Sequence, residues 1–533
     1  MKRYQKVLLW GAAAVVLAVI AIQVYISFFL EDQLRNRITH QVRQSSDGEY
    51  RLELEDLDIG LLSRSVTLTG ISVQSENERI HGETQELNLS GISLLRFWRQ
   101  NALSIQEIDV QNPSITLISE RSGGSSGRSP AELSGRLASG ILQELNELRV
   151  GEILISGVSV NIAEAPDTGP YFSFNETDLI LYDFKVDSSA LNSESILPVN
   201  NIETTLRNME YHTTDGLYTL KFQQLEFSGH TGSANITGTE MLPRLEREAF
   251  FNKVGYATDQ IDLEIPFIRF RGIDFNAINR QEKYEAELVQ MNRADIRIFR
   301  DKRYPEREDK EIQPVPQELI LNLNFSLRID TLEVLESFVR YSEHEEGADE
   351  PGEVDFSSLN ATLTNMTNVG EQIELNNEMI LEAKANVMDQ AELNAKFVFP
   401  LMEHRHFIEG TVESMDATHF NRALEPLAFQ RIESGRVLSI QFLMELGEEE
   451  ASGDVEFLYE DLNITLLSEG SNDENLITKA GTFLANTFAI ESNNNDPEDP
   501  RIGEVSFERD KEKFVFNYWW KSLQSGLESS IGL

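Results

Sequence analysis

Short runs in which every second residue is apolar recur along most of the chain after residue 50. In the segment 50–73, Leu52 and Leu54 alternate with charged residues, and Val66 and Leu68 repeat the pattern a few residues later. An alternation of period two is typical of a β-strand that buries one face. The segment therefore predicts two strands joined by a short turn.

The alternation changes phase by one residue at Gly70, because Ile71 and Val73 take the apolar positions after it. A glycine at such a change predicts a β-bulge or a close approach of two backbones. The surrounding pattern (apolar, any residue, Gly, Ile or Val, Ser or Asp, apolar) recurs in four segments: LTGISV at 68–73, LSGISL at 89–94, ISGVSV at 155–160 and FRGIDF at 270–275. We interpret it as a repeated strand device.

The same alternation predicts most of the remaining chain as strands. The expected strand segments are 103–118 with a turn at Asn112-Pro113, 148–300 in several pieces, 319–335, 379–399, 407–413, 437–446, 453–467, 504–507 and 514–518. Helical periodicity is confined to about 130–147, 416–427, 474–490 and 519–531. The composition of 121–129 predicts a flexible linker, and the charged, proline-bearing stretch 304–317 a boundary between two halves.

The N-terminal segment Val7–Leu30 is apolar and, at about 1.5 Å per helical residue, long enough to cross a bilayer. Basic residues precede it and Glu31 and Asp32 follow, which predicts a cytoplasmic N-terminus and a body on the other side. A cleaved signal peptide is the alternative, but its apolar core should be shorter and end in small residues. The expected anchor residues are Trp10, Val16, Ile20, Tyr25 and Phe29.

Composition excludes several classes of function. The formal net charge of −43 repels nucleic acid, so we expect no nucleic-acid partner. The absence of cysteine excludes disulfides, thiolate nucleophiles and cysteine-bound metals. The acidity could also reflect a salty habitat, which one sequence does not separate from function.

Candidate chemistry is sparse. His404 and His406 are two residues apart and could ligate a metal, but no third ligand follows from the sequence, and a solvent-facing strand is the better interpretation. The run 493–499 offers oxygen ligands without the spacing of a calcium loop, which favours a plain turn. No histidine-based zinc motif, nucleophile elbow or phosphate-binding loop is present. We therefore expect no enzyme, no cofactor and no metal site.

The predicted helices are too few to cover one apolar face on every predicted strand. Two sheets could pack face to face as dry sandwiches, or one long curved sheet could enclose apolar cargo such as acyl chains. The sequence leaves both open. In the second case, the strand residues that would line a lipid groove are Leu52, Leu54, Val66, Leu68, Ile71, Val73, Ile108, Val110, Ile115, Leu117, Ile153 and Ile155.

The order of these segments resembles the AsmA-like family of Gram-negative envelope proteins, relatives of the chorein-type, bridge-like lipid-transfer proteins. The resemblance rests on the anchor and on the segments 65–73, Ile108-x-Val110-x-x-Pro113-x-Ile115, 151–160, 432–435 and 453–467. It implies a single-pass inner-membrane protein with a periplasmic body and a lipid-lined groove, acting in phospholipid transport or outer-membrane maintenance. Its partners would be the inner membrane, phospholipid and possible envelope proteins.

The fold we expect is mainly β: a transmembrane helix followed by an elongated, curved, mostly antiparallel, groove-like sheet with a few short helices. The expected regions are a tail at 1–6, the anchor at 7–30, an N-terminal AsmA-like β region at 31–120, linker and amphipathic helix at 121–147, a middle β region at 148–304, a charged linker at 305–317, a C-terminal AsmA-like β region at 318–512 and a terminal strand and amphipathic segment at 513–533.

The C-terminal segment has two interpretations. Trp519, Trp520, Leu523 and Leu527 could form an interface with a bilayer or a partner channel. Alternatively, the segment caps the last strand and closes the end of the sheet. The rival function for the whole chain is a non-catalytic scaffold for outer-membrane biogenesis with a dry interior.

Overall fold

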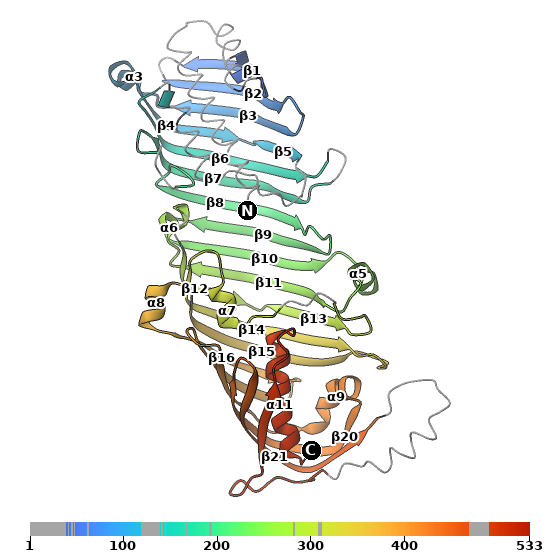
Figure 1. The fold of residues 1–533 in the computed structure, drawn as a ribbon. Coiled ribbons are helices and arrows are strands. Elements are labelled where there is room, and N and C mark those ends of the chain that lie inside the picture. The colour runs from blue at the N-terminus through green and yellow to red at the C-terminus, as the bar shows by residue number, and fades with distance from the viewer. Residues whose placement is uncertain are drawn as a thin grey trace. The chain divides into compact units, whose positions relative to one another are not determined.

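The computed structural model describes residues 39–532, except for 41, 44–45, 47, 61–62, 119–138, 140–141, 144, 166–168, 191–194, 281–282, 308–311 and 468–489. The described part of the chain is mainly β, with 22 strands that belong to one mixed sheet (Figure 1), which confirms the predicted class. Within the described part, no helix is both long and apolar enough to span a membrane. The predicted anchor and its residues Trp10, Val16, Ile20, Tyr25 and Phe29 lie outside the described residues.

The chain divides into two compact units. Unit 1 comprises residues 1–238 and 271–284, and unit 2 comprises 239–270 and 285–533. The elements of unit 1 are β1 (Tyr50–Gly60), β2 (Ser65–Ser75), β3 (Ile80–Ser90), α3 (Leu94–Gln100), β4 (Ala102–Gln111), β5 (Ser114–Ile118), β6 (Glu147–Ala163), β7 (Phe172–Val186), β8 (Asn201–His212), β9 (Tyr218–Ser228), the start of β10 (Ser233–Pro243) and α6 (Phe275–Asn279).

Within the described residues, unit 2 holds the later strands and most of the helices. Its elements are the end of β10, α5 (Arg247–Val254), β11 (Asp259–Arg271), β12 (Tyr284–Asn292), β13 (Asp295–Asp301), α7 (Pro316–Leu321), β14 (Leu327–His344), β15 (Gly352–Thr367), α8 (Gly370–Leu375), β16 (Glu378–Val387), β17 (Ala391–Pro400), β18 (His406–Val412), β19 (Met415–Asp416), η2 (Ala417–Phe420), α9 (Asn421–Ala428), β20 (Gln430–Leu446), β21 (Glu450–Leu466), β22 (Ile502–Glu508) and α11 (Val515–Ser530).

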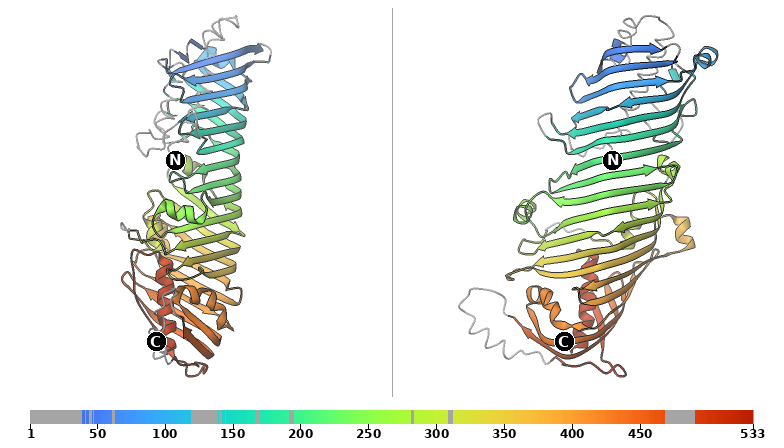
Figure 2. Two further views of the ribbon diagram at one scale, coloured as in Figure 1. Left: turned by 90° about the vertical axis from the view of Figure 1, so that its right-hand side faces the viewer. Right: turned by 180° about the vertical axis from the view of Figure 1, so that it is seen from behind.

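Neighbouring strands pair antiparallel in most ladders, such as β1 with β2 and β16 with β17. However, β6 runs parallel to β4 and β5, and β14 runs parallel to β13. In unit 1 the strands follow one another down the sheet nearly in chain order (Figures 1 and 2). This order lets each strand extend the same apolar face, because directly paired residues point to the same side.

The glycines of the repeated signature all adopt a left-handed backbone. Their φ angles are 58° at Gly70, 67° at Gly91, 68° at Gly157 and 71° at Gly272. A Cβ at Gly70 would approach Glu55 Cγ to 2.3 Å, so it is the Glu55 side chain, rather than a second backbone, that comes close there. The pairing of β1 with β2 shows no register shift at this point, because the buried positions of β1 also skip, from Leu54 to Leu57. Both strands therefore change phase together.

One predicted strand starts too early, and another is wrong. The stretch 319–335 begins inside α7, and its strand starts only at Leu327, because Pro316 at the first helical turn and Glu318 at its third position favour a helix start. The stretch 514–518 is helical, since α11 begins at Val515. The helix predicted at 416–427 matches η2 and α9, whereas that at 474–490 lies outside the described residues.

Candidate functional site

The predicted groove residues share one face of β1, β2, β4, β5 and β6. Leu52, Leu54, Val66, Leu68, Ile71, Val73, Ile108, Val110 and Ile153 belong to one apolar cluster, Ile115 and Leu117 belong to a second, and Ile155 packs against both. All of them are buried except Ile155, which is half-buried. The alternation therefore identified one continuous apolar face.

Segments outside the strands pack against the first of these clusters. Leu145 is part of it, and Val42, Leu142, Leu197 and Val199 lie against it from the connections before β1, before β6 and before β8. At this end of unit 1, the apolar face is thus covered by the chain's own side chains.

The same face continues onto β8 and β9, where it is half-buried. Leu181 of β7 is paired with Ile202 of β8, and Leu206 of β8 with Leu225 of β9, which fixes these side chains on one side. We call the half-buried residues of this face the unit 1 strip: Ile202, Leu206, Met209, Tyr211, Leu220, Phe222, Leu225 and Phe227. Helix α6 reaches one end of the strip, where the ring centroids of Phe275 and Phe227 are 6.2 Å apart.

Unit 2 carries a comparable surface on β11, β13, β14 and β15. Register pairs these strands residue by residue across the sheet, so that their apolar positions form two rows. The half-buried residues of these rows form the unit 2 strip: Ile261, Ile298, Tyr341 and Val354 in one row and Leu263, Ile296, Val339 and Phe356 in the other.

One end of the unit 2 strip is polar. The Tyr341 hydroxyl donates to Glu343 Oε2 at 2.6 Å, and Arg300 Nε lies 3.5 Å from Asp259 Oδ1. Burial, together with the nearby Glu343 carboxylate, raises the pKa of Tyr341, so the phenol stays neutral. The strip therefore combines an apolar surface with a charged margin.

In contrast, α11 covers the apolar face of the C-terminal strands of unit 2 (Figures 1 and 2). Of the predicted C-terminal interface residues, Trp519, Leu523 and Leu527 pack against the core of β18, β20 and β21, whereas Trp520 remains 49% exposed. The packing is tight, because a Cβ on Gly526 would come within 2.4 Å of Val455 Cγ2. This part of the segment acts as the predicted cap.

The edge of the sheet beside α11 is closed by serines. The backbone N–H groups of Glu504 and Ser506 on β22 donate to the hydroxyl oxygens of Ser529 and Ser525 at 3.1 and 3.2 Å. The two serines are four residues apart and share one face of the helix. They take the place that carbonyls of a further strand would occupy.

His406 lies inside this core rather than on a solvent-facing strand, so that prediction was wrong. It is 1% exposed, and Trp519 Nε1 donates to its Nε2 at 2.7 Å. Burial, and secondarily the charge of Arg509, lowers the pKa of His406 to about 3. His404 is exposed in the preceding turn and lies 3.0 Å from Glu318, so the two histidines do not converge on a metal.

The run 493–499 forms a turn in which Asn494 is buried. Its side chain accepts from the backbone N–H of Arg501 and donates to the Phe457 and Arg501 carbonyls. The amide thus organises the turn internally. Among the described residues, no group of three or more His, Asp or Glu side chains is arranged to hold a metal ion.

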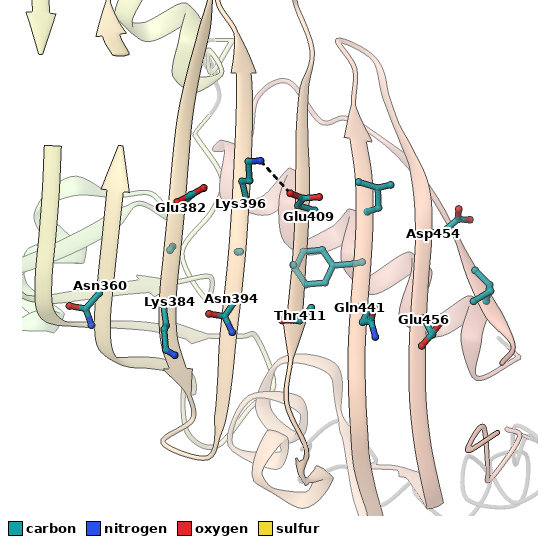
Figure 3. Close-up of a pocket in the computed structure, with 16 residues that line it drawn as sticks. Asn360, Glu382, Lys384, Asn394, Lys396, Glu409, Thr411, Gln441, Asp454 and Glu456 are labelled. Atoms are coloured by element: carbon teal, nitrogen blue, oxygen red, sulfur yellow. Dashed lines mark ion pairs between the residues drawn. The ribbon is translucent and has the colours of Figure 1, made fainter. Parts of the chain in front are cut away.

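A hollow of about 810 Å³ lies on β16, β17, β18, β20 and β21, on the face opposite the one that α11 covers (Figure 3). Lys396 approaches Glu409 at 3.6 Å across it, and Lys384 reaches Glu392 at 2.6 Å at its margin. Leu443 and Ile502 add exposed apolar surface. The described lining contains no histidine, and both of its lysines are paired with glutamates, so the hollow offers a polar recognition surface rather than a nucleophile and base.

Sequence reasoning missed the two half-buried strips. The signal was present, because 217–229 and 260–275 show the same alternation as the predicted groove residues. Alternation shows which side chains share a face, but it does not show which strands another segment covers.

No family model and no curated protein matches this sequence. Among solved structures, the C-terminal domain of the sex pheromone staph-cAM373 precursor from Staphylococcus aureus aligns at 9% identity, with a TM-score of 0.09. The alignment covers 54% of this chain and 65% of that chain. A likeness at this level carries no argument about fold or function.

Proposed function

We propose that this protein is an inner-membrane-anchored, periplasmic protein that holds or passes phospholipid between envelope membranes and so contributes to outer-membrane maintenance, without catalysis. Acyl chains would lie along the unit 1 strip and the unit 2 strip. The elongated, curved, mostly antiparallel sheet and the single anchor at 7–30 belong to this proposal, as does the resemblance to AsmA-like proteins.

The half-buried strips carry the proposal. The unit 1 strip places large side chains such as Leu206, Phe222 and Leu225 on one face of adjacent strands, next to the part of the same face that the chain's own side chains cover. Burying an acyl chain there would stabilise the complex by about 0.8 kcal/mol per methylene. The polar end of the unit 2 strip suits a ligand with one charged end.

The alternative is a dry scaffold that recruits partners for outer-membrane biogenesis. Its specific support is the burial of nearly all predicted groove residues by protein side chains, and the cover that α11 provides in unit 2. On this alternative, the strips would contact other proteins.

Gentle detergent extraction of the full chain, followed by lipid mass spectrometry, tests the proposal. We expect phospholipid in near-stoichiometric amount with the wild-type protein. Phe222→Glu combined with Leu225→Glu should remove most of it, because two carboxylates on the strip would have to be desolvated by an acyl chain.

Gln224→Glu combined with Glu226→Gln is the matched control. Both residues lie on the opposite face of β9, where the Gln224 amide donates to Glu226 Oε1 at 2.6 Å. Exchanging them keeps an amide beside a carboxylate, places the carboxylate across from Arg207 and leaves the strip unchanged. Retention of lipid by the control and loss by the double variant, both with unchanged unfolding midpoints, is the expected result. A stable wild-type protein free of lipid would overturn the proposal and leave the scaffold.

A further inference from the structure

Helix α3 is basic and aromatic in an otherwise acidic chain. The segment 91–104, GISLLRFWRQNALS, contains Arg96 and Arg99 but no acidic residue, although the whole chain has a net charge of −43. A local reversal of charge of this kind marks a surface that differs from the rest of the molecule in the partner it attracts.

The two aromatic residues of α3 differ in their exposure to solvent. Phe97 packs against the apolar cluster of β1–β7, whereas Trp98 is 82% exposed. The helix ends at Gln100, and Asn101 follows it with a left-handed backbone (φ 49°), while the Asn101 N–H donates to the Phe97 carbonyl. Ser93 N–H donates to the Ser104 carbonyl at 2.9 Å, which ties the start of α3 to β4. Trp98 is therefore held outward by a short helix fixed at both ends.

A further arginine joins this surface from the β1–β2 turn. The backbone N–H of Ile92 donates to the Arg64 carbonyl at 3.2 Å, which places the turn beside the start of α3. Arg64 and Arg99 are exposed, while Arg96 approaches Glu147 at 3.7 Å. We call Arg64, Trp98 and Arg99 the α3 patch.

We propose that the α3 patch contacts the surface of a bilayer that contains anionic phospholipid. An indole is suited to the interface between headgroups and acyl chains, where its ring is apolar and its N–H finds a hydrogen-bond partner. Two exposed arginines beside it complement lipid phosphates, and guanidinium binds phosphate in a bidentate manner. The remaining acidic surface would be repelled by the same lipids, so the patch also sets which part of unit 1 faces the bilayer.

This inference concerns a contact with a membrane surface, and it stands apart from lipid held on the strips. Fluorescence of the full chain, reconstituted in vesicles that contain brominated phosphatidylglycerol, tests it directly. The chain has four tryptophans, Trp10, Trp98, Trp519 and Trp520. A Trp10→Phe background removes the one in the expected anchor.

In this background, we expect bromine quenching of tryptophan emission, with Trp98→Phe abolishing at least about half of it. Trp520→Phe is the matched control, because Trp520 is also exposed but lies on α11, and it should leave the quenching in place. Quenching that survives Trp98→Phe unchanged would overturn the proposal and would favour a protein partner for the patch.

The arginines provide a second test with the same quenching measurement. Arg64→Gln with Arg99→Gln should weaken the contact of the patch with anionic vesicles by about fivefold in its equilibrium constant per arginine, and so reduce the quenching. The pair should have little effect in vesicles of brominated zwitterionic lipid. Arg293→Gln is the control, because Arg293 is exposed and, like Arg64, has a positive φ (56° and 54°). Equal losses from the pair and from the control would contradict a lipid contact. Lipid that co-purifies with the strips should be unaffected by any of these variants.

Discussion

The strands β8–β9 in unit 1 and β18–β21 in unit 2 have the same alternation of apolar and polar residues. Their apolar faces nevertheless differ in how deeply they are buried. In unit 2, α11 lies on that face, and Leu446 and Val455 are completely buried. In unit 1, the corresponding residues of β8 and β9, such as Leu206 and Leu225, are half-buried. The difference lies in the cover rather than in the strands.

This contrast separates two roles that alternation alone does not distinguish. An apolar residue beneath a helix stabilises the fold, because its removal leaves a cavity. An apolar residue on a half-buried strip contributes less to stability and leaves surface for a ligand or a partner. The same side chain, leucine, can therefore be tested in both settings.

The largest effect is expected from Leu446→Ala, which should lower the free energy of unfolding by about 2–5 kcal/mol, because Leu446 is 0% exposed in the α11-covered core. Leu225→Ala removes the same atoms from the unit 1 strip and should cost about 1 kcal/mol. Equilibrium unfolding in urea, followed by circular dichroism, measures both. Equal costs would show that the strip is as tightly packed as the core, and the comparison would fail.

The next largest effect is a dependence of stability on pH, and it is expected in the core that α11 covers. His406 has a pKa lowered to about 3 in the folded protein, against 6.5 for a free histidine. Below pH 6.5 the unfolded chain takes up a proton that folded His406 does not, so stability falls as the pH decreases toward 3. At pH 4.5 the loss attributable to this residue should be about 2–3 kcal/mol.

His406→Gln isolates that contribution, because the Gln oxygen can still accept from Trp519 Nε1 and does not titrate. We expect the stability difference between wild type and variant to shift in favour of the variant on going from pH 7 to 4.5. Urea midpoints at the two pH values give this difference, and carboxylates cancel because both proteins share them. A constant difference would show that His406 is hydrated, and that α11 does not seal the core.

Much of the fold was predictable because local rules govern it. The turn at Asn112-Pro113, the left-handed signature glycines and the hairpin of β20 and β21 follow from residue type and period two. The strand predicted at 319–335 starts too early because Leu319 to Leu321 read equally well as strand or helix, and the proline at 316 decided the matter.

For the candidate site, the sequence predicted which side chains share a face, but not which of them other segments cover. The sequence placed Leu52, Val66 and Ile108 on a shared apolar side, and the structure has them there. It could not show that Leu142 and Leu145 would approach that side while β8 and β9 stayed half-buried, because such contacts join segments far apart in the chain. Likewise, nothing near His406 in sequence indicates Trp519 as its partner.

The smallest effect concerns the edge strand β22, whose backbone N–H groups donate to serines of α11. Ser525→Ala with Ser529→Ala removes the hydroxyls that accept from the Ser506 and Glu504 N–H groups. These N–H groups lie at an exposed edge, so water replaces the serines, and the better helix propensity of alanine offsets part of the loss. We expect a loss of about 1 kcal/mol or less in the free energy of unfolding, but amide hydrogen exchange at Glu504 and Ser506 should become about five- to tenfold faster.

Gln524→Ala, on the same helix, is the control and should leave both amides protected. If exchange at these amides is unchanged in the double variant, the edge of β22 is protected by something other than α11, and the helix covers the face of the sheet without closing its edge.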